Sequence, residues 1–238
     1  MQRQESSEMS KRAIVLVSGG LDSCVLLNYV VQHVQADYVY GLSFYYGQRH
    51  GRELEMAEKQ MEMLSVENEH VVEDISCYGK MLNGTSTLVA DGDDVPQLEG
   101  IDEQDLDQPP TYVPNRNMVF LALAAGFAEA RGAPVVYYGA HRQDEYSYWD
   151  CTDRFIERMN SVLELNRRTP IQVEAPFVNM SKADIVREGT RLNVDFTYTW
   201  SCYKGGKTPC GSCPTCQERK NAFVEAGVQD PLHVESEL

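Results

Sequence analysis

The chain has 238 residues, which is long enough for one large domain with a buried core. It carries 36 acidic and 21 basic residues, and the resulting net charge of −15 disfavours stable binding to a nucleic-acid backbone. No apolar run approaches the roughly 20 residues of a membrane helix, and residues 1–11 are polar with no apolar signal core. These features predict a cytoplasmic protein that binds neither membranes nor nucleic acid stably, with 1–11 as a disordered arm.

Short apolar runs alternate with helical segments along the chain. Strands are predicted at 13–17, 38–44, 70–75 and 135–140, and helices at 21–34, 52–64, 116–131, 153–165 and 181–192. The last helix opens with Ser181, and Asp184 three residues later is close to a capping box. Strands that alternate with helices predict an α/β fold, a doubly wound parallel sheet with helices on both faces.

One stretch of the chain has no periodicity. Residues 91–110 hold eight acids and three prolines, which predicts a mobile surface loop over about 83–111. A solvated linker and a lid over the active site are both consistent with this composition.

A glycine turn stands between the first strand and the first helix. Its two glycines let the backbone approach a ligand closely, and the helix start that follows directs N–H groups at an anion. The turn has no lysine, so it is not a Walker A sequence, and Asp22 is explained if it holds a magnesium ion that bridges phosphates. A bare glycine turn is often only a turn. The candidate phosphate-binding residues are Ser18, Gly19, Gly20, Leu21, Asp22, Ser23 and Cys24, and the resemblance given below implies that they bind ATP.

Four of the seven cysteines fall within fifteen residues, and they are Cys202, Cys210, Cys213 and Cys216. An odd number of cysteines without an export signal argues against a disulfide framework. Four thiolates with no histidine suit a closed tetrahedral zinc site that fixes the fold. An iron–sulfur cluster and four unrelated thiols are the alternatives. We therefore expect an α/β domain at 12–195 and a small zinc-binding C-terminal region at 196–238.

The full run SGGLDS after a buried strand resembles the pyrophosphate loop of the N-type ATP pyrophosphatases. These enzymes share a doubly wound α/β fold of the adenine nucleotide alpha hydrolase type. The resemblance implies that the loop holds the β- and γ-phosphates of ATP while the α-phosphate is attacked. The substrate oxygen then receives AMP and becomes a good leaving group.

The glycine turn and the cysteine cluster together resemble one family, QueC, along nearly the whole chain. Residues 46–50, YGQRH, are similar to the family's YxQRH stretch, and 112–117, YVPNRN, are similar to its FVPGRN. Pro176 and residues 182–186 match a further pattern, and TWSCY at 199–203 with the later cysteines is similar to the family's zinc loop. The chain departs from the family at 145–152, at the carboxyl end of a strand where α/β sheets bind ligands. This departure either alters the substrate or marks a subfamily.

The resemblance implies an ATP-dependent ligase that converts 7-carboxy-7-deazaguanine and ammonia to 7-cyano-7-deazaguanine through an adenylated acid and an amide. It also implies a homodimer and a product used for queuosine or archaeosine. Two other enzymes fit the same motifs: a tRNA base-modifying pyrophosphatase, and a relative that couples a deazaguanine acid to a protein amine. A zinc-stabilised binding module is the non-enzymatic alternative, and the intact SGGLDS argues against it.

Roles are expected for several further side chains. The predicted catalytic residues are Asp22, Ser23, Arg49 and Arg116. The arginines would neutralise a carboxylate or phosphate with paired donors, and surface ion pairs are the alternative. A guanine-like ring needs an acceptor and an aromatic face, and His50 is interpreted as a packed or capping residue. The predicted substrate contacts are Tyr46, Asp144, Tyr148 and Asp150.

Overall fold

A parallel β-sheet forms the centre of the computed structural model, which describes residues 11–48, 51–82, 85–88, 111–142, 148–204 and 206–232. Its strands are β1 (Arg12–Leu16), β2 (Tyr38–Tyr45), β3 (Glu67–Asp74), β4 (Val135–Tyr137) and β5 (Gln172–Glu174). Their order is β3-β2-β1-β4-β5, and all neighbours are parallel. In this register Ile14 of β1 lies opposite Tyr40 of β2 and Val136 of β4.

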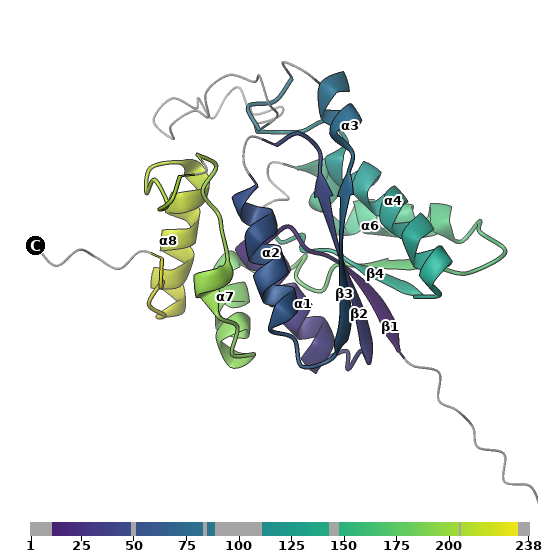
Figure 1. Ribbon diagram of the computed structural model, residues 1–238, viewed down its shortest axis with the longest axis horizontal. Coiled ribbons are helices and arrows are strands. Elements are labelled where there is room, and N and C mark those ends of the chain that lie inside the picture. The colour runs from purple at the N-terminus through teal and green to yellow at the C-terminus, as the bar shows by residue number, and fades with distance from the viewer. Residues whose placement is uncertain are drawn as a thin grey trace, which may run out of the picture.

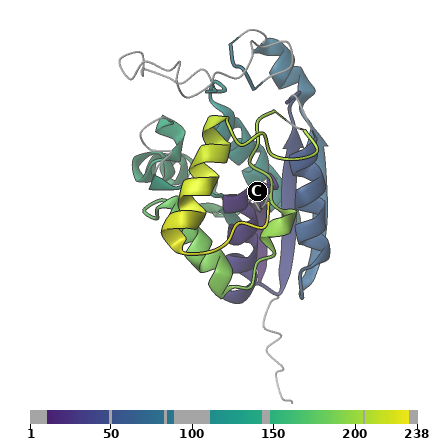
Figure 2. The same ribbon diagram turned by 90° about the vertical axis from the view of Figure 1, so that its left-hand side faces the viewer.

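Helices cover both faces of this sheet. The helices of the described residues include α1 (Leu21–Gln32), α2 (Arg52–Glu62), α3 (Ser76–Met81), α4 (Arg116–Arg131), α6 (Asp153–Leu163), α7 (Lys182–Arg191) and α8 (Pro214–Ala226). Short 3₁₀ helices, η3 (Trp149–Cys151) and η4 (Phe196–Tyr198), precede α6 and follow α7. Helices α1, α2, α7 and α8 lie on one side of the sheet, and α4 and α6 lie on the other (Figure 1). Figure 2 looks onto the first of these layers, with α8 nearest to the viewer.

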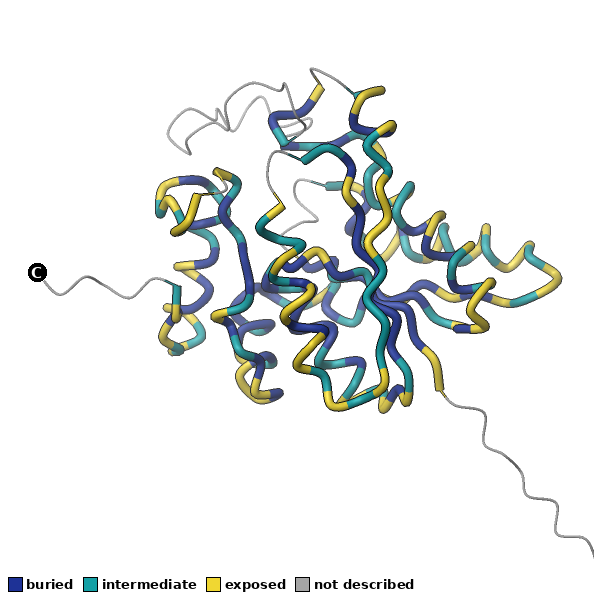
Figure 3. Tube along the Cα trace, viewed as in Figure 1, coloured by how far each residue is buried: buried dark blue, intermediate teal, exposed yellow. Residues whose placement is uncertain are grey.

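Both faces of the central strands are buried. Val15 of β1 packs in the cluster that includes α1, α7 and α8, whereas its neighbour Ile14 packs in the cluster that includes α4 and α6. A strand that is covered on both faces reads as a continuous apolar run, which is why AIVLV has no polar alternation. Figure 3 shows this arrangement as buried strands between helices that are exposed on their outer faces.

The expected strands and helices are present, with shifted ends. Helix α4 covers 116–131 as predicted and ends at Gly132, which has a left-handed backbone. The capping box of α7 is confirmed, because Ser181 Oγ accepts from Asp184 N–H and the Asp184 carboxylate accepts from Ser181 N–H. Strand β3 begins before the predicted 70–75, and β4 ends at Tyr137 rather than at residue 140. The sequence pattern missed β5, α3 and α8.

The C-terminal region packs into the same core as the sheet helices. Phe223 of α8 is buried in one cluster with Val25 of α1. Arg219 of α8 is fully buried, and its guanidinium donates to both carboxylate oxygens of Asp230, at 2.8 and 2.9 Å, and to Thr199 Oγ1 at 2.8 Å. These bonds fix α8 to the segment that follows α7.

The strand order creates a crevice at one edge of the sheet. The chain passes from β1 to β2 and β3 on one side and returns to β4 on the other side of β1. Such a reversal opens a ligand site at the carboxyl ends of the strands, and the glycine turn follows β1 at this point. Within the described residues, no helix is long and apolar enough to cross a membrane. Outside the described residues lie 1–10 of the arm predicted at 1–11, most of the acidic loop, Arg49, His50 and Asp144.

Candidate active site

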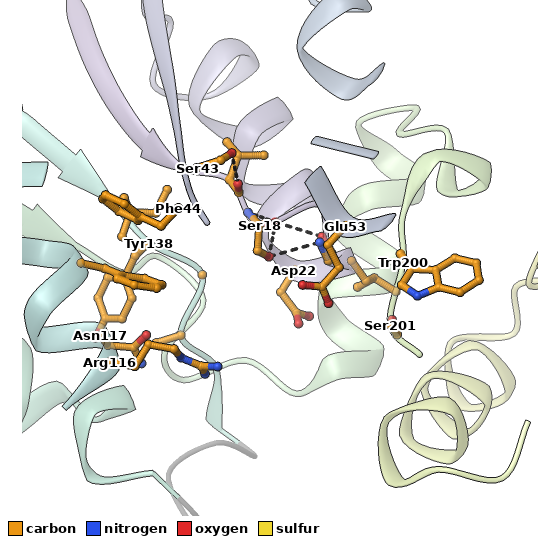
Figure 4. A pocket seen from close by; sticks show the side chains of 18 of the residues that line it. Ser18, Asp22, Ser43, Phe44, Glu53, Arg116, Asn117, Tyr138, Trp200 and Ser201 are labelled. Atoms are coloured by element: carbon orange, nitrogen blue, oxygen red, sulfur yellow. Dashed lines mark hydrogen bonds between the residues drawn. The ribbon is translucent and has the colours of Figure 1, made fainter. Parts of the chain in front are cut away.

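A cavity of about 280 Å³ opens where β1, β2 and β4 end. Helices α1, α2, α4 and α7 and the C-terminal region contribute side chains to its wall. Figure 4 shows Ser18, Asp22 and Glu53 in the middle of this wall, with the rings of Phe44 and Tyr138 on one side. The cavity therefore has a polar centre and an aromatic end.

The glycine turn is fixed by contacts on two sides. Gly19 has a φ of +87°, and a Cβ added to it would overlap the backbone carbonyl oxygen of Glu53. On its other side, the Trp200 N–H donates to the Gly19 carbonyl at 2.9 Å. A larger residue is therefore excluded at this position by both backbone conformation and space.

The serine hydroxyls close the turn over the start of α1. Ser23 Oγ accepts from the Ser18 N–H at 3.2 Å and donates to the Gly20 carbonyl at 3.0 Å. Ser18 Oγ accepts from the Gly20 N–H at 3.2 Å. The first N–H groups of a helix have no intrahelical partner, and within the described chain no capping side chain accepts from those of α1. This positive helix end suits a phosphate group.

Asp22 and Lys182 form a charged pair in the cavity wall. Lys182 Nζ lies 3.3 Å from Asp22 Oδ2 and donates to Glu218 Oε2 at 2.9 Å. His141 Nε2 lies 3.7 Å from Asp22 Oδ2. Burial raises the pKa of Asp22, but the charges of Lys182 and His141 more than offset it, so this pKa lies below its usual value. Asp22 is therefore ionised at neutral pH.

Lys182 supplies the cation that the glycine turn lacks. It is the first residue of α7, where a positive charge opposes the helix dipole, and it is only 7% exposed. Neither the dipole nor the burial favours a lysine here, so the position indicates a functional charge. Sequence reasoning did not assign Lys182 or His141 to the site, although a buried cation at a helix start was the available signal.

A magnesium ion fits the free oxygen of Asp22. Among the described residues, Asp22 Oδ1 is buried and has no hydrogen-bond partner. Magnesium in phosphate sites is held by one or two carboxylates and by the substrate phosphates themselves. Asp22 is therefore the residue that would hold such an ion.

Stacked rings form the aromatic end of the cavity. The rings of Phe44 and Phe120 have centroids 4.6 Å apart at an angle of 29°, and Tyr46 packs on Phe120 at 5.6 Å. The hydroxyl of Tyr148 lies 2.8 Å from Thr111 Oγ1, which fixes this ring. A flat wall of this kind suits a planar heteroaromatic ligand.

Arg116 keeps a positive charge at this end. Burial lowers its pKa, but the nearby hydroxyls of Tyr46, Tyr148 and Tyr203 more than offset this, and the pKa lies above its usual value. The side chain lies in the cavity wall beside Asn117 (Figure 4). A fixed guanidinium can pair with a carboxylate or a phosphate.

Some of the predicted site residues line the cavity and others do not. Tyr46 and Tyr148 line the cavity, as does every residue of the turn except Gly19 and Cys24. Asp150 is not among the lining residues, because its carboxylate is 2% exposed and accepts from the Asn117 N–H at 3.1 Å, at the start of α4. Cys24 is fully buried, and burial raises its pKa to about 12, which describes a core residue.

The four clustered cysteines are brought together by a loop and the first turn of α8. Cys213 precedes this helix and Cys216 lies within it, so the cluster extends beyond the single loop that was expected. The four sulfur atoms lie within 4.8 Å of one another, with Cys210 Sγ 3.9 Å from Cys216 Sγ. A tetrahedron with metal–sulfur bonds of about 2.3 Å has edges of about 3.8 Å, so this set fits one metal ion. Backbone N–H groups support the sulfurs, since Cys210 N donates to Cys202 Sγ at 3.3 Å.

The cysteine cluster also shapes the cavity. Trp200, whose backbone bonds to Gly19, donates its indole N–H to the Cys202 carbonyl at 2.9 Å. On α8, Thr215 Oγ1 donates to the Ser201 carbonyl at 2.6 Å. The cavity residues from this region are Trp200, Ser201, Tyr203, Thr215 and Glu218. A metal in the cluster would therefore hold one wall of the cavity in place.

A doubly wound sheet with an anion-binding turn at its switch point defines a nucleotide-using α/β enzyme. The family model described as "Queuosine biosynthesis protein QueC" matches residues 12–227. The chain belongs to the QueC family, and its activity is that of a 7-cyano-7-deazaguanine synthase in queuosine precursor biosynthesis.

Individual relatives agree over nearly the whole chain. The 7-cyano-7-deazaguanine synthase of Caldicellulosiruptor bescii is 43% identical over 227 residues, which cover 95% of this chain and 99% of the relative. The synthase of Archaeoglobus fulgidus is also 43% identical, over 222 residues, with 93% and 89% covered. Among solved structures, an NMN synthetase from Francisella tularensis is similar at 14% identity with a TM-score of 0.49, over 92% of this chain and 78% of that chain.

Proposed function

We propose that one cavity carries out two ATP-dependent activations in turn, using 7-carboxy-7-deazaguanine, ammonia and ATP. The first activation turns the carboxylic acid into a primary amide, and the second turns this amide into the nitrile. The observation that carries the proposal is the Asp22–Lys182 pair, 3.3 Å apart beside the uncapped start of α1.

The polar centre of the cavity is suited to pyrophosphate. The start of α1 offers N–H groups and Lys182 offers a charge, and both favour the β- and γ-phosphates of ATP. A magnesium ion on Asp22 would add further positive charge where negative charge develops on the leaving phosphates. If pyrophosphate is the group that is held, the α-phosphate is attacked and each activation releases pyrophosphate and, later, AMP.

The aromatic end is suited to the deazaguanine ring. Phe44, Phe120 and Tyr46 offer flat faces for it, and Arg116 offers a charge for its carboxylate. Tyr148 completes the proposed set of contacts. Arg49 and Asp144 stay predictions from the sequence.

The bond changes explain why two activations are needed. The carboxylate oxygen bonds to the α-phosphorus of ATP, pyrophosphate leaves, and ammonia then displaces AMP to form the amide. The amide oxygen bonds to the α-phosphorus of a second ATP as pyrophosphate leaves, and loss of AMP from carbon together with both nitrogen protons leaves the C≡N bond. Each of the two departing oxygens is a poor leaving group until it has been joined to AMP.

We further infer that the cysteine cluster holds one structural zinc ion per chain, because four thiolates leave no open coordination position for catalysis. A homodimer stays a prediction from the family resemblance, and light scattering at high protein concentration tests it, since a monomeric mass would contradict it. We also place the enzyme in the cytoplasm, where ATP is available and thiols stay reduced. The use of the product for archaeosine stays a prediction from the family resemblance.

The test is mass spectrometry after incubation of the purified chain with 7-carboxy-7-deazaguanine, ammonium and ATP with magnesium. We expect the nitrile, with AMP and pyrophosphate as the nucleotide products, and none without magnesium. A stable amide as the final product, or ADP and phosphate in place of AMP, would contradict the proposal.

A further inference from the structure

Among the residues that the structure describes, three carboxylates line the cavity, and they differ in their partners. Asp22 and Glu218 both lie within salt-bridge distance of Lys182, at 3.3 and 2.9 Å. Glu53 lies in the first turn of α2, and no residue in the described part of the chain forms a salt bridge with it. Lys182 therefore pairs with Asp22 and Glu218 and does not neutralise Glu53.

The position of Glu53 is fixed relative to the glycine turn. Its backbone carbonyl lies against Gly19, so closely that a Cβ at Gly19 would overlap it. Figure 4 shows the Glu53 side chain extending into the cavity close to the turn. The carboxylate therefore lies beside the place where the phosphates of ATP are proposed to bind, and across from Arg116.

The environment of Glu53 allows it to exchange a proton near neutral pH. Burial raises its pKa to about 7, although the charge of Arg116 acts in the opposite direction. The Cys24 thiol and the Tyr203 hydroxyl are also near enough to interact with Glu53. Burial raises the pKa of both groups, so both stay protonated and neutral at this pH. Asp22, the other acid beside the turn, has a lowered pKa and stays ionised.

The proposed reaction requires a base that takes protons from the substrate nitrogen. When ammonia forms a C–N bond and AMP leaves, the nitrogen must lose one proton to become a neutral amide. When the adenylated amide loses AMP, the C–O bond breaks and both remaining nitrogen protons are lost. In the amide-forming step the N–H electron pair stays on nitrogen as its lone pair, and in the nitrile-forming step the two N–H pairs supply the two new C–N bonds. Each proton goes to a base, which releases it to water before it takes the next.

We propose that Glu53 is the catalytic base that takes protons from the substrate nitrogen in both the amide-forming and the nitrile-forming step. This role rests on the proposed function above. It requires the nitrogen to lie between the Glu53 carboxylate and the adenylated oxygen. Asp22 and Glu218 are excluded from it because both are paired with Lys182.

Two assays of the full-length enzyme separate adenylation, in which no nitrogen loses a proton, from nitrile formation, in which the substrate nitrogen does. The first assay is isotope exchange between pyrophosphate and ATP, with 7-carboxy-7-deazaguanine and no ammonia, which requires only adenylation. The second is conversion of supplied amide to nitrile. Glu53→Gln should keep the exchange at the wild-type rate and slow the nitrile step by about 100-fold or more. The matched control is Glu55→Gln, an exposed glutamate on the same helix, which should keep both rates.

The pH dependence gives a second readout, because supplied amide removes any effect of pH on the ammonia concentration. The wild-type rate of the nitrile step should rise with pH through an apparent pKa near 7. Glu53→Asp should retain a rise, and Glu53→Gln should lose it. His141 also lines the cavity. A rise that persists in Glu53→Gln would assign the proton transfer to another group and overturn the proposal.

Two further outcomes would also overturn it. Equal loss of exchange and of nitrile formation in Glu53→Gln would mean that Glu53 acts on ATP or on the fold. A variant with both rates intact would mean that Glu53 is not the base. A wild-type enzyme that makes no nitrile would contradict the proposed function itself, and the role of Glu53 with it, which is a different result from a defect in the variant alone.

Discussion

Lys182 of α7 lies 3.3 Å from Asp22 of α1, although the two residues are far apart in the chain. In a Walker A sequence the phosphate-binding lysine is part of the glycine-rich loop. Here the loop has none, and a buried lysine at the start of another helix lies beside it. The same lysine pairs with Glu218 of α8, so the side chain of Lys182 links the glycine turn, α7 and the C-terminal region.

Replacing Lys182 with alanine should therefore reduce catalysis sharply. We expect kcat on supplied amide to fall by about 100-fold or more, because a cation at the developing charge of pyrophosphate is lost. The variant should also be less stable, since two carboxylates lose their shared partner. Steady-state kinetics and urea unfolding measure the two effects. The control is Lys204→Ala, an exposed lysine, and wild-type kinetics in Lys182→Ala would remove this lysine from the mechanism.

Replacing Cys213 with serine should release the metal and open the cavity wall. Protein purified without added metal should contain one zinc per chain, and the variant should contain none. A four-thiolate site contributes on the order of 10 kcal/mol of coupled folding free energy, so the C-terminal region should lose its fold. Cys77→Ser, at an exposed cysteine outside the cluster, is the control. Iron with visible absorbance in the wild-type protein would show that the site holds an iron–sulfur cluster instead.

Glu53 should make the stability of the free enzyme depend on pH. Its folded-state pKa of about 7 lies above the ordinary value of 4.5, so the folded chain binds more protons between these values. The free energy of unfolding therefore falls as pH rises through this window. Glu53→Gln removes the buried charge and should stabilise the chain by about 1 to 3 kcal/mol at about pH 8, with no gain at about pH 4. An equal gain at both pH values in urea unfolding would contradict the raised pKa.

The buried pair of Arg219 and Asp230 should be essential for the C-terminal region. Its side chains are 1% and 5% exposed, so Asp230→Asn leaves a buried guanidinium without its counter-charge. We expect the free energy of unfolding to fall by about 3 to 5 kcal/mol. Glu62→Gln, which breaks the exposed Lys59–Glu62 pair, should cost less than about 1 kcal/mol. Equal effects of the two variants would show that Arg219 does not depend on Asp230.

The sequence predicted the elements that have strong local patterns. The apolar run at 13–17 and the helix at 116–131 are each long or uniform enough to be read alone. Strand β5 has three residues, of which only Val173 is buried, and this is too short for a period to appear. Helix α8 begins among cysteines and prolines whose metal-binding spacing obscures a helical pattern.

Residue patterns alone predicted the candidate site only where it is local in sequence, and the family resemblance added Tyr46, Arg116 and Tyr148, which line the cavity. The glycine turn and the cysteine cluster are contiguous motifs, and both were found. Lys182, His141 and Glu53 come from separate elements, and they meet only because the sheet order brings those elements to one edge. The substrate contact expected of Asp150 stays a prediction, and its carboxylate accepts from the Asn117 N–H at the start of α4, a contact between distant segments that no local pattern reveals.

One cavity is proposed to perform two activations, with the amide as the intermediate between them. The most direct measurement is the ratio of AMP formed to nitrile formed, with supplied amide and no ammonia in one reaction and with acid and ammonia in the other. Because each departing oxygen needs its own adenylation, we expect one AMP per nitrile from the amide and two from the acid. No nitrile from the amide, or the same ratio from both substrates, would contradict the account.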